Sequence, residues 1–146
     1  PMQWSDEKNA GFSKAPAEDL YLPVNPAVDR PTVAAQEADP HSLLNRVRAL
    51  IQTRHSLKAL DADAHFEVVY AESGRLPFVY MRAKEGQKLL VAVNPSNQTV
   101  SVELPKELLD SPPENLDVPK STSLEQANSG WQLTLGPVSG AIFRVS

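Results

Sequence analysis

The stretch of sequence that decides the fold is FVYMRAKEGQKLLVAVN, residues 78–94. It contains two runs rich in β-branched and aromatic residues, 78–82 and 89–94, and the pair Glu85-Gly86 lies between them. Residues of these kinds favour strands, and a Gly-containing pair between two such runs is typical of a tight turn. The stretch therefore predicts two neighbouring antiparallel strands.

More runs of the same kind occur in the chain, at residues 66–70, 100–104, 131–135 and 141–145. Segments rich in Gly, Asn, Pro and Ser separate them, so the sequence predicts a mainly β fold, an antiparallel β-sandwich. Residues 105–122 hold four prolines and are predicted to be a long surface connection with one edge strand at 116–118. We expect the period-2 alternation to turn seven side chains inward: Val68, Tyr80, Leu90, Val100, Val102, Leu133 and Ile142.

Upstream of the strands, residues 40–58 predict an amphipathic α-helix, because apolar side chains recur there at three- and four-residue steps. The apolar positions are Leu43, Leu44, Val47, Leu50, Ile51 and Leu57. We expect Asp39 to be the N-cap and Pro40 to occupy the first helical position. A short turn of helix is predicted just before it, at residues 32–38, with Thr32 as its cap.

The first 31 residues have a different character. They contain five prolines and no sustained period of 2 or 3.6 residues, which predicts an extended, irregular chain. Such a long segment without regular structure normally leans on another surface. We therefore expect residues 1–31 to pack poorly on their own domain.

Composition excludes several classes of function. The chain has 146 residues, 41% of them apolar, which suffices for one modest core. Its net charge of -4 comes with no stripe of Lys or Arg, so nucleic acid is excluded as a partner. No apolar run approaches the length that spans a bilayer, which excludes membrane insertion. There is no cysteine and no visible signal peptide, and the compartment stays open.

The titratable residues form no recognisable catalytic constellation. Carboxylates occur close together in pairs such as Asp6-Glu7, Glu18-Asp19 and Asp61/Asp63. Each pair lies in polar or proline-broken sequence, where nothing would separate the pKa values of its two members. The histidines are not at metal-ligand spacings, and neither a nucleophile elbow nor a Gly-rich phosphate loop is present. We predict no catalytic residue, no metal site and no cofactor in this chain.

Aromatic rings remain as candidates for a binding function, because sugar-binding modules stack pyranose rings on exposed Trp and Tyr faces. Tyr21 lies in the irregular segment and Trp131 follows a turn, so both are candidates for sugar stacking. Tyr70 and Tyr80 lie in alternating strands, where packing against the core is the commoner outcome.

Five motifs follow one another through the first part of the chain. They are Pro1-Met2-Gln3-Trp4, Asn9-Ala10-Gly11-Phe12-Ser13, Leu20-Tyr21-Leu22-Pro23-Val24-Asn25-Pro26, Val33-Ala34-Ala35-Gln36 and Asp39-Pro40-His41-Ser42-Leu43-Leu44. In this order they resemble the stretch after the eighth barrel strand of oligo-1,6-glucosidases, α-glucosidases and trehalose synthases. These enzymes belong to glycoside hydrolase family thirteen of the α-amylase superfamily. The strand-rich remainder is similar in position and pattern to that family's C-terminal β-domain.

The resemblance implies two parts. Residues 1–59 would be the end of a (β/α)8 catalytic barrel, with its rim loop and last helix, and residues 60–146 would be the C-terminal antiparallel β-domain. Loops that follow barrel strands line the catalytic face. The candidates for the substrate rim are then Met2, Gln3, Trp4 and Asn25.

The resemblance also implies that the catalytic groups lie elsewhere. In the family, two aspartates and a glutamate on earlier barrel strands act as nucleophile, transition-state stabiliser and general acid/base, and this sequence would begin downstream of all three. The chain would be an accessory region, not catalytic alone, of a retaining α-glucosidase, oligo-1,6-glucosidase or trehalose synthase. Its partners would be the catalytic barrel and an α-glucoside or maltodextrin substrate. Ala27-Val28 stands where oligo-1,6-glucosidases tend to carry Asn-Tyr, so hydrolysis and isomerisation both stay open.

An independent α-glucan-binding module is the alternative. It would need two or more coplanar exposed aromatic rings, whereas an accessory region needs an apolar patch beside helix 40–58. Without a barrel, the apolar stripe of this helix would exceed what monomers usually leave exposed. The isolated chain is therefore expected to self-associate through helix 40–58 or to fold its N-terminal segment over it.

Overall fold

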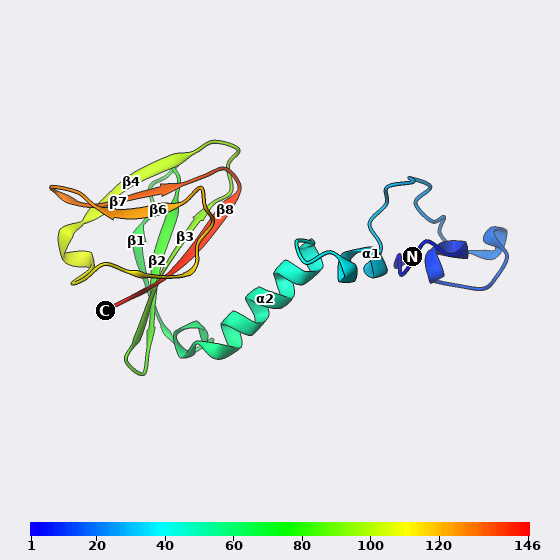
Figure 1. Ribbon diagram of the computed structural model, residues 1–146, viewed down its shortest axis with the longest axis horizontal. Helices are drawn as coiled ribbons and strands as arrows, with labels where there is room; N and C mark the ends of the chain where they lie inside the picture. The colour runs from blue at the N-terminus through cyan, green and yellow to red at the C-terminus, as the bar shows by residue number, and fades with distance from the viewer. The chain divides into compact units, whose positions relative to one another are not determined.

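The computed structural model describes residues 1–146, and its contacts divide the chain into two compact units, residues 1–53 and 54–146. The second unit holds eight antiparallel strands in two sheets (Figure 1). A five-stranded sheet has the order β1-β2-β3-β8-β5, and a three-stranded sheet has the order β4-β7-β6. The strands are β1 His65–Tyr70, β2 Phe78–Lys84, β3 Gln87–Asn94, β4 Val100–Pro105, β5 Glu114–Asp117, β6 Ser123–Gln126, β7 Gly130–Leu135 and β8 Ser139–Val145.

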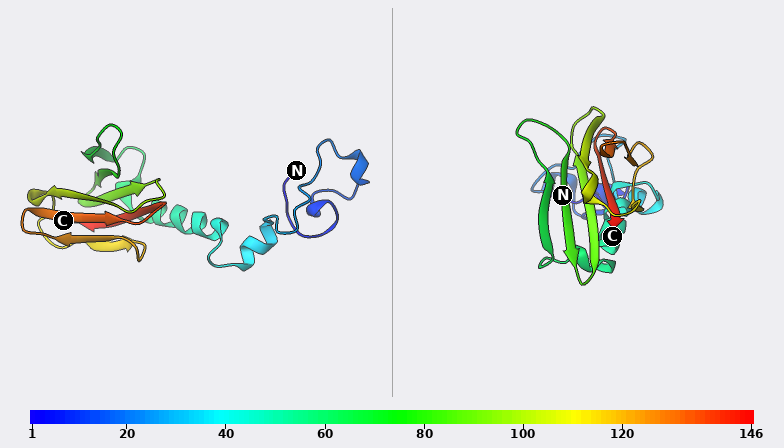
Figure 2. Two further views of the ribbon diagram at one scale, coloured as in Figure 1. Left: turned by 90° about the horizontal axis from the view of Figure 1, so that it is seen from above. Right: turned by 90° about the vertical axis from the view of Figure 1, so that its left-hand side faces the viewer.

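The two sheets pack face to face as a sandwich, so the predicted mainly β fold is confirmed. The right-hand view of Figure 2 separates the green strands β1 to β3 from the olive to orange strands of the smaller sheet. One apolar core lies between them and takes side chains from both sheets. Its buried members are Val79, Leu90, Ala92, Leu104, Leu109, Trp131, Leu133, Leu135, Ala141, Phe143 and Val145.

Three of the seven side chains predicted to point inward lie on the opposite face of the large sheet. Leu90 and Leu133 are fully buried in the core, and Val100 and Val102 pack against it. Val68, in contrast, is 50% exposed. Tyr80 pairs in register with Val68, and Ile142 belongs to a second cluster outside the core. Both faces of β2 and β3 are apolar, so alternation alone does not indicate which face the other sheet covers.

The strand β1 contains a β-bulge. Its register with β2 shifts between Val68 and Tyr70, so Val69 is the extra residue. As a result, Val69 and Tyr70 both pack against the core although they are consecutive in the sequence. A bulge of this kind bends the strand and increases its local twist.

The segment predicted as a surface connection carries more structure than expected. The strand β5 confirms the expected edge strand, two residues earlier than predicted, and it follows the 3₁₀ helix η4, Lys106–Leu108. The strand β6 was not predicted. Its sequence, Ser-Leu-Glu-Gln, has little intrinsic β propensity, and pairing with β7 supplies the order that the residues themselves do not.

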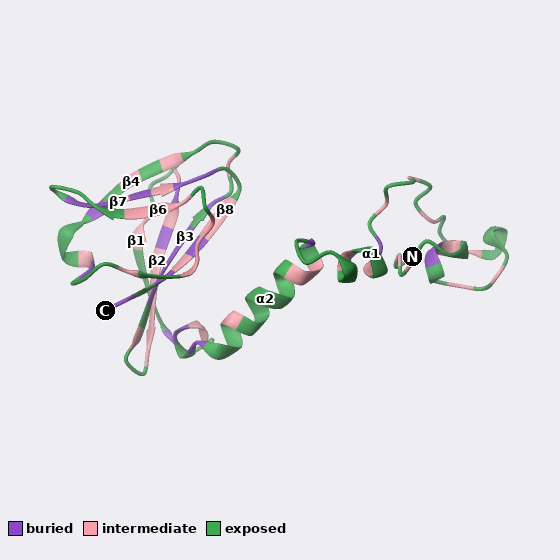
Figure 3. Ribbon diagram, viewed as in Figure 1, coloured by how far each residue is buried: buried purple, intermediate pink, exposed green.

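The first unit contains two helices and two 3₁₀ turns. They are η1 Lys8–Gly11, η2 Ala17–Asp19, α1 Val33–Ala38 and α2 Leu43–Ser56, the last of which runs on into the second unit. Thr32 caps α1 as predicted, because its hydroxyl accepts from the backbone N–H of Ala35. Figure 3 shows that exposed residues dominate this unit. Within residues 1–31 only Ala10 is buried, which agrees with the expected poor packing.

The start of α2 differs from the prediction. The helix begins at Leu43 instead of Pro40, and Ser42 takes the capping position, its Oγ accepting from the backbone N–H of Asn45 at 3.2 Å. The Asp39 carboxylate instead accepts from the N–H of His41 at 2.8 Å. Such a local bond stabilises a turn in competition with a helix start. Asp39 and Pro40 therefore form the corner between α1 and α2.

No helix of the structure has the length and apolarity that a membrane crossing requires.

Asn94 is fully buried and joins two turns at one end of the sandwich. Its Nδ2 donates to the carbonyls of Gln98 and Gly136, both at 2.8 Å. Its Oδ1 accepts from the N–H and the hydroxyl of Ser96. Each carbonyl also accepts from a serine hydroxyl, Gln98 from Ser96 and Gly136 from Ser139, so removal of the amide would take away one of two donors at each carbonyl.

We predict that Asn94→Ala lowers the free energy of unfolding by about 2–4 kcal/mol, because a fully buried amide loses its hydrogen bonds to both turns at about 1 kcal/mol each. Chemical denaturation of the purified chain measures the change. The exposed Asn97 of the same turn provides the control, and Asn97→Ala should change the stability by less than about 0.5 kcal/mol. Equal effects of the two substitutions would contradict a role for the buried amide.

Candidate functional site

The residues predicted for the substrate rim lie in two separate non-helical stretches of the first unit. Gln3 and Trp4 are held by their backbone, since their carbonyls accept from the N–H groups of Val33 and Ala34 at 2.9 and 3.0 Å. These bonds tie the segment to the first turn of α1. The side chains of Met2 and Trp4 are 54% and 50% exposed. They are therefore available to a neighbouring surface or ligand.

Asn25 uses its side chain to form a turn. Its Oδ1 accepts from the N–H of Ala27 at 3.0 Å. This bond is an Asx-turn of the kind that Asn favours beside proline. It fixes the backbone of the Val24-Asn25-Pro26 motif. The role of Asn25 at a substrate rim stays a prediction.

The two candidates for sugar stacking differ sharply. Tyr21 is 97% exposed, so its ring is free to contact a ligand. Trp131 is 3% exposed and belongs to the core between the sheets. The prediction for Trp131 is therefore wrong, because β7 is the middle strand of the small sheet and this side chain faces the large one. A ring buried in this way offers no platform to a sugar.

The structure brings together a group of residues where the helix α2 gives way to the sheet. The η3 turn, Lys58–Leu60, follows α2, and Arg82 of β2 donates hydrogen bonds to the carbonyls of Ala59 and Asp61. The amide oxygen of Gln87 accepts from the N–H of Ala59 at 3.4 Å. These bonds fasten the incoming chain to the hairpin of β2 and β3.

Lys84 completes this junction. Its ammonium group lies 2.9 Å from the carboxylate of Asp61 and 2.7 Å from that of Asp63. Hydrogen bonds to Lys84 lower the pKa of both carboxyls below the ordinary value of 3.8. In turn, the hydrogen bonds to Asp63 and Asp61 raise the pKa of the Lys84 ammonium. The pair that the sequence indicated as solvated is thus a two-carboxylate clamp on one lysine.

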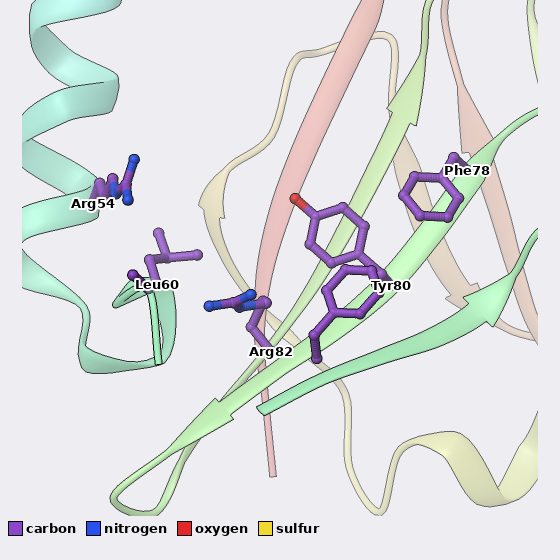
Figure 4. Close-up of a pocket in the computed structure, with 7 residues that line it drawn as sticks. Arg54, Leu60, Phe78, Tyr80 and Arg82 are labelled. Carbon is purple, nitrogen blue, oxygen red and sulfur yellow. The ribbon is translucent and has the colours of Figure 1, made fainter. Parts of the chain in front are cut away.

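A groove of about 490 Å³ opens beside the junction on the outer face of the large sheet. In Figure 4 the rings of Phe78 and Tyr80 stand along β2, and Arg82 points from the same strand towards Leu60. The ring centroids of Phe66 and Phe78 lie 5.1 and 5.3 Å from that of Tyr80, each at an angle of 34°. Arg54, from the last turn of α2, and Ala62 complete the lining. An aromatic row of this kind offers apolar contact area.

Sequence reasoning missed this groove, although one signal was available. Phe78 and Tyr80 alternate with Val79 and Met81, so β2 is apolar on both sides. Strands with two apolar faces are typical of sheets that are covered on both sides. No group of three or more His, Asp or Glu side chains lies close enough to hold a metal ion.

Comparison with known sequences assigns the chain to a family. The sequence model of the maltogenic amylase C-terminal domain matches residues 66–142, more than half of the chain. The model of the α-amylase catalytic domain matches residues 1–63. The chain belongs to the α-amylase family.

Relatives within the α-amylase family are similar over most or all of the chain. The trehalose synthase of Thermus thermophilus is 32% identical over 98% of the chain, which spans 15% of that protein. The oligo-1,6-glucosidase of Heyndrickxia coagulans is 36% identical over 72% of the chain, with 18% of its own length covered. The trehalulose synthase MutB of Pseudomonas mesoacidophila MX-45 superimposes with a TM-score of 0.78 at 30% identity. The match covers the whole chain and 25% of the MutB chain.

The α-amylase-family chain thus corresponds to the C-terminal region of these relatives and spans at most a quarter of the lengths quoted. The resemblance that the motifs indicated is confirmed. The junction built by Arg82 and Lys84 lies where the two matched ranges meet, since residues 59 and 61 fall within the first range and the strand β2 within the second.

We predict that Lys84→Met lowers stability in a manner that depends on pH. The carboxyls of Asp61 and Asp63 have lowered pKa values in the folded state, so their contribution is present above pH 3.8 and is lost as the pH falls through those lowered values. The contribution of Lys84, whose pKa is raised from 10.5, persists until alkaline pH. The parent should therefore exceed the variant in denaturant midpoint near neutral pH, and the difference should shrink below about pH 3.5.

The exposed Lys88 of β3 supplies the matched control. Lys88→Met removes the same charge from the same hairpin without touching the clamp. A Lys84→Met effect that equals the Lys88→Met effect, or that does not vary with pH, would contradict the clamp.

Proposed function

We propose that this chain is the C-terminal accessory region of an α-glucosidase-type glycoside hydrolase or transglucosidase that acts on α-glucosidic bonds. The observation that carries the proposal is the head-to-tail match of two family models, catalytic domain at residues 1–63 and C-terminal domain at 66–142. Relatives with these parts include a trehalose synthase and oligo-1,6-glucosidases. Accordingly, both transfer and hydrolysis are within the proposed activity.

In this proposal residues 1–59 form the end of a (β/α)8 barrel, and residues 60–146 form the C-terminal domain. Catalytic residues of such barrels lie on loops at the carboxyl ends of the strands. A segment that follows the last strand would reach the catalytic rim, where the exposed side chains of Met2 and Trp4 could contact substrate. Gln3 and Asn25, whose backbones are fixed by hydrogen bonds, would shape the same rim.

The exposed apolar face of the helix α2 is an argument for a barrel partner. Leu43, Val47, Leu50 and Ile51 are 73%, 44%, 39% and 50% exposed. Their spacing puts them on one helical face. Apolar area buried at this face would contribute about 25 cal/mol per Å². We propose that it packs on the barrel wall, and that a chain deprived of the barrel self-associates through it.

The alternative, an independent α-glucan-binding module, has less support. Trp131 is buried, which removes one of its two aromatic candidates. In the groove, the rings of Phe66 and Phe78 are each tilted by 34° to the ring of Tyr80, so the three rings do not form the flat platform on which a sugar stacks.

We predict that the purified 146-residue chain does not hydrolyse or rearrange maltose, isomaltose or sucrose, because the proposed nucleophile and general acid lie outside it. Product analysis by chromatography measures this. The comparison is the longer protein that carries this chain after a catalytic barrel, which should act on at least one of these sugars. Turnover by the chain alone, abolished by substituting one of its own carboxylates, would overturn the proposal.

We also predict that Trp4→Ala in that longer protein lowers kcat/KM on its α-glucoside by about ten-fold or more, as expected when a positioning contact at the rim is lost. Val28→Ala is the control, because Val28 is 98% exposed in the same unit and no rim role is proposed for it. Unchanged kcat/KM in Trp4→Ala would remove this residue from the rim.

A further inference from the structure

Three consecutive residues of the first unit, Asn9, Ala10 and Gly11, have a left-handed backbone. Asn9 and Ala10 have φ angles of 54° and 55° and ψ angles of 32° and 31°, and Gly11 has a φ angle of 68°. Residues other than glycine normally visit this region singly, because their Cβ then crowds the following carbonyl oxygen. A run of this kind persists only where the surrounding structure determines it, and such strain clusters at functional sites.

Asn9 supplies the side chain that holds this left-handed turn. Its Nδ2 donates to the carbonyls of Ser13 at 3.1 Å and Ala15 at 2.8 Å. The backbone adds a bond from the N–H of Phe12 to the carbonyl of Asn9 at 3.0 Å. Asn is also one of the few residues with a side chain that tolerates the left-handed region. Asn9 therefore closes residues 9–15 into one loop.

Ala10 connects the turn to the predicted substrate rim. Its carbonyl accepts from the backbone N–H groups of Trp4 at 2.8 Å and Ser5 at 3.2 Å. Ala10 is 1% exposed, so water has little access to this contact. The carbonyl of Trp4 accepts from the N–H of Ala34 at 3.0 Å. The backbone of Trp4 is thus bonded on both sides, while its ring remains 50% exposed.

Gly11 allows the turn to lie close to Trp4. A Cβ atom on Gly11 would be 2.7 Å from the Oγ of Ser5 and 3.3 Å from the Cβ of Trp4. The first distance is a clash and the second is a tight contact, so glycine suits both the space and the φ angle. The base of the Trp4 side chain therefore rests directly against the turn.

A simple reversal of the chain does not require this conformation. A type I turn reverses a chain with right-handed residues and accepts most side chains. What the left-handed turn adds here is the placement of the Ala10 carbonyl and of Gly11 against Trp4. The strain is therefore concentrated where one exposed aromatic side chain is held.

We propose that Asn9 is a positioning residue for the substrate: through the left-handed turn it holds Trp4, so that the exposed ring presents one orientation to an α-glucoside. This inference rests on the proposed function, because the contact between Trp4 and the substrate is proposed there. The amide of Asn9 is already bonded to Ser13 and Ala15, so Asn9 acts through Trp4 and not by touching the sugar. A ring that is ordered in advance favours the reaction, because less ordering remains when substrate binds.

A double-substitution cycle in the longer protein tests this role. Asn9→Ala should lower kcat/KM on the α-glucoside by about five-fold or more, and mainly through kcat, because a misoriented ring keeps its contact area. In a protein that already carries Trp4→Ala, the same substitution should lower kcat/KM by less than about two-fold, since no ring remains to be positioned. If Asn9→Ala fails to fold, Gly11→Ala takes its place in the cycle with the same expectations.

Asn45→Ala is the matched control. The Nδ2 of Asn45 also bridges backbone carbonyls, those of Gln36 at 3.0 Å and Asp39 at 2.8 Å, at the corner between α1 and α2. This variant should lower the thermal midpoint as Asn9→Ala does, but should leave kcat/KM within about two-fold of the parent value. Equal losses of kcat/KM in the two variants would overturn the proposal. So would an Asn9→Ala loss that is just as large in the Trp4→Ala background, or one confined to KM.

Hydrogen exchange of the longer protein gives a readout that does not depend on activity. The N–H groups of Trp4 and Ser5 should exchange at least about ten-fold faster after Asn9→Ala and at the parent rate after Asn45→Ala, because the Ala10 carbonyl protects them. A longer protein that acts on α-glucosides, with exchange and kcat/KM unchanged by Asn9→Ala, retains the proposed function and loses the positioning role. Faster exchange in a protein that acts on no α-glucoside would overturn the proposed function and the substrate role of the turn together.

Discussion

The strand β3 is buried on both faces, and the rest of the second unit depends on this constraint. Leu90 and Ala92 face the core between the sheets, whereas Leu89 and Val91 lie on the other side and are also buried. A strand with two apolar faces must lie inside its sheet and must be covered from two directions. The small sheet supplies one cover. The turn after α2 supplies part of the other, which is why the chain has to enter the domain at this place.

The elements that the sequence predicted are those whose local chemistry and tertiary role agree. The hairpin of β2 and β3 has strand-forming runs around a glycine turn, and Thr32 provides a cap that needs only its own helix. The strand β6 has no such local signal, because its pairing with β7 determines it. The clamp on Lys84 could not be predicted from the sequence either, since its two carboxylates are 21 and 23 residues away in the chain. Contacts across such distances depend on the register of strands, which periodicity alone does not specify.

The boundary in the sequence and the boundary in the packing fall at different places. The catalytic-domain match extends to residue 63, whereas the compact unit that contains the sheets already begins at Arg54. Residues 54–63 therefore match the catalytic domain in sequence but belong to the sandwich unit by contact. Arg82 and Lys84 hold this shared segment from the sheet side. A C-terminal domain that is exchanged between relatives from residue 64 onward would lack Leu57 and Ala59, which cover Leu89. A domain that begins at residue 54 would retain them.

The β-bulge lies in an edge strand, where it limits pairing with the strands of other chains. The strands β1 and β5 are the two edges of the large sheet, and unpaired edges are templates for pairing with other chains. The bulge at Val69 interrupts the regular row of hydrogen-bonding groups on one edge. On the other edge, β5 has four residues and follows Pro112 and Pro113. Both edges of the large sheet therefore resist the addition of further strands, which would extend the sheet into a fibre. Association through the apolar outer face of the sheet is not restricted in this way.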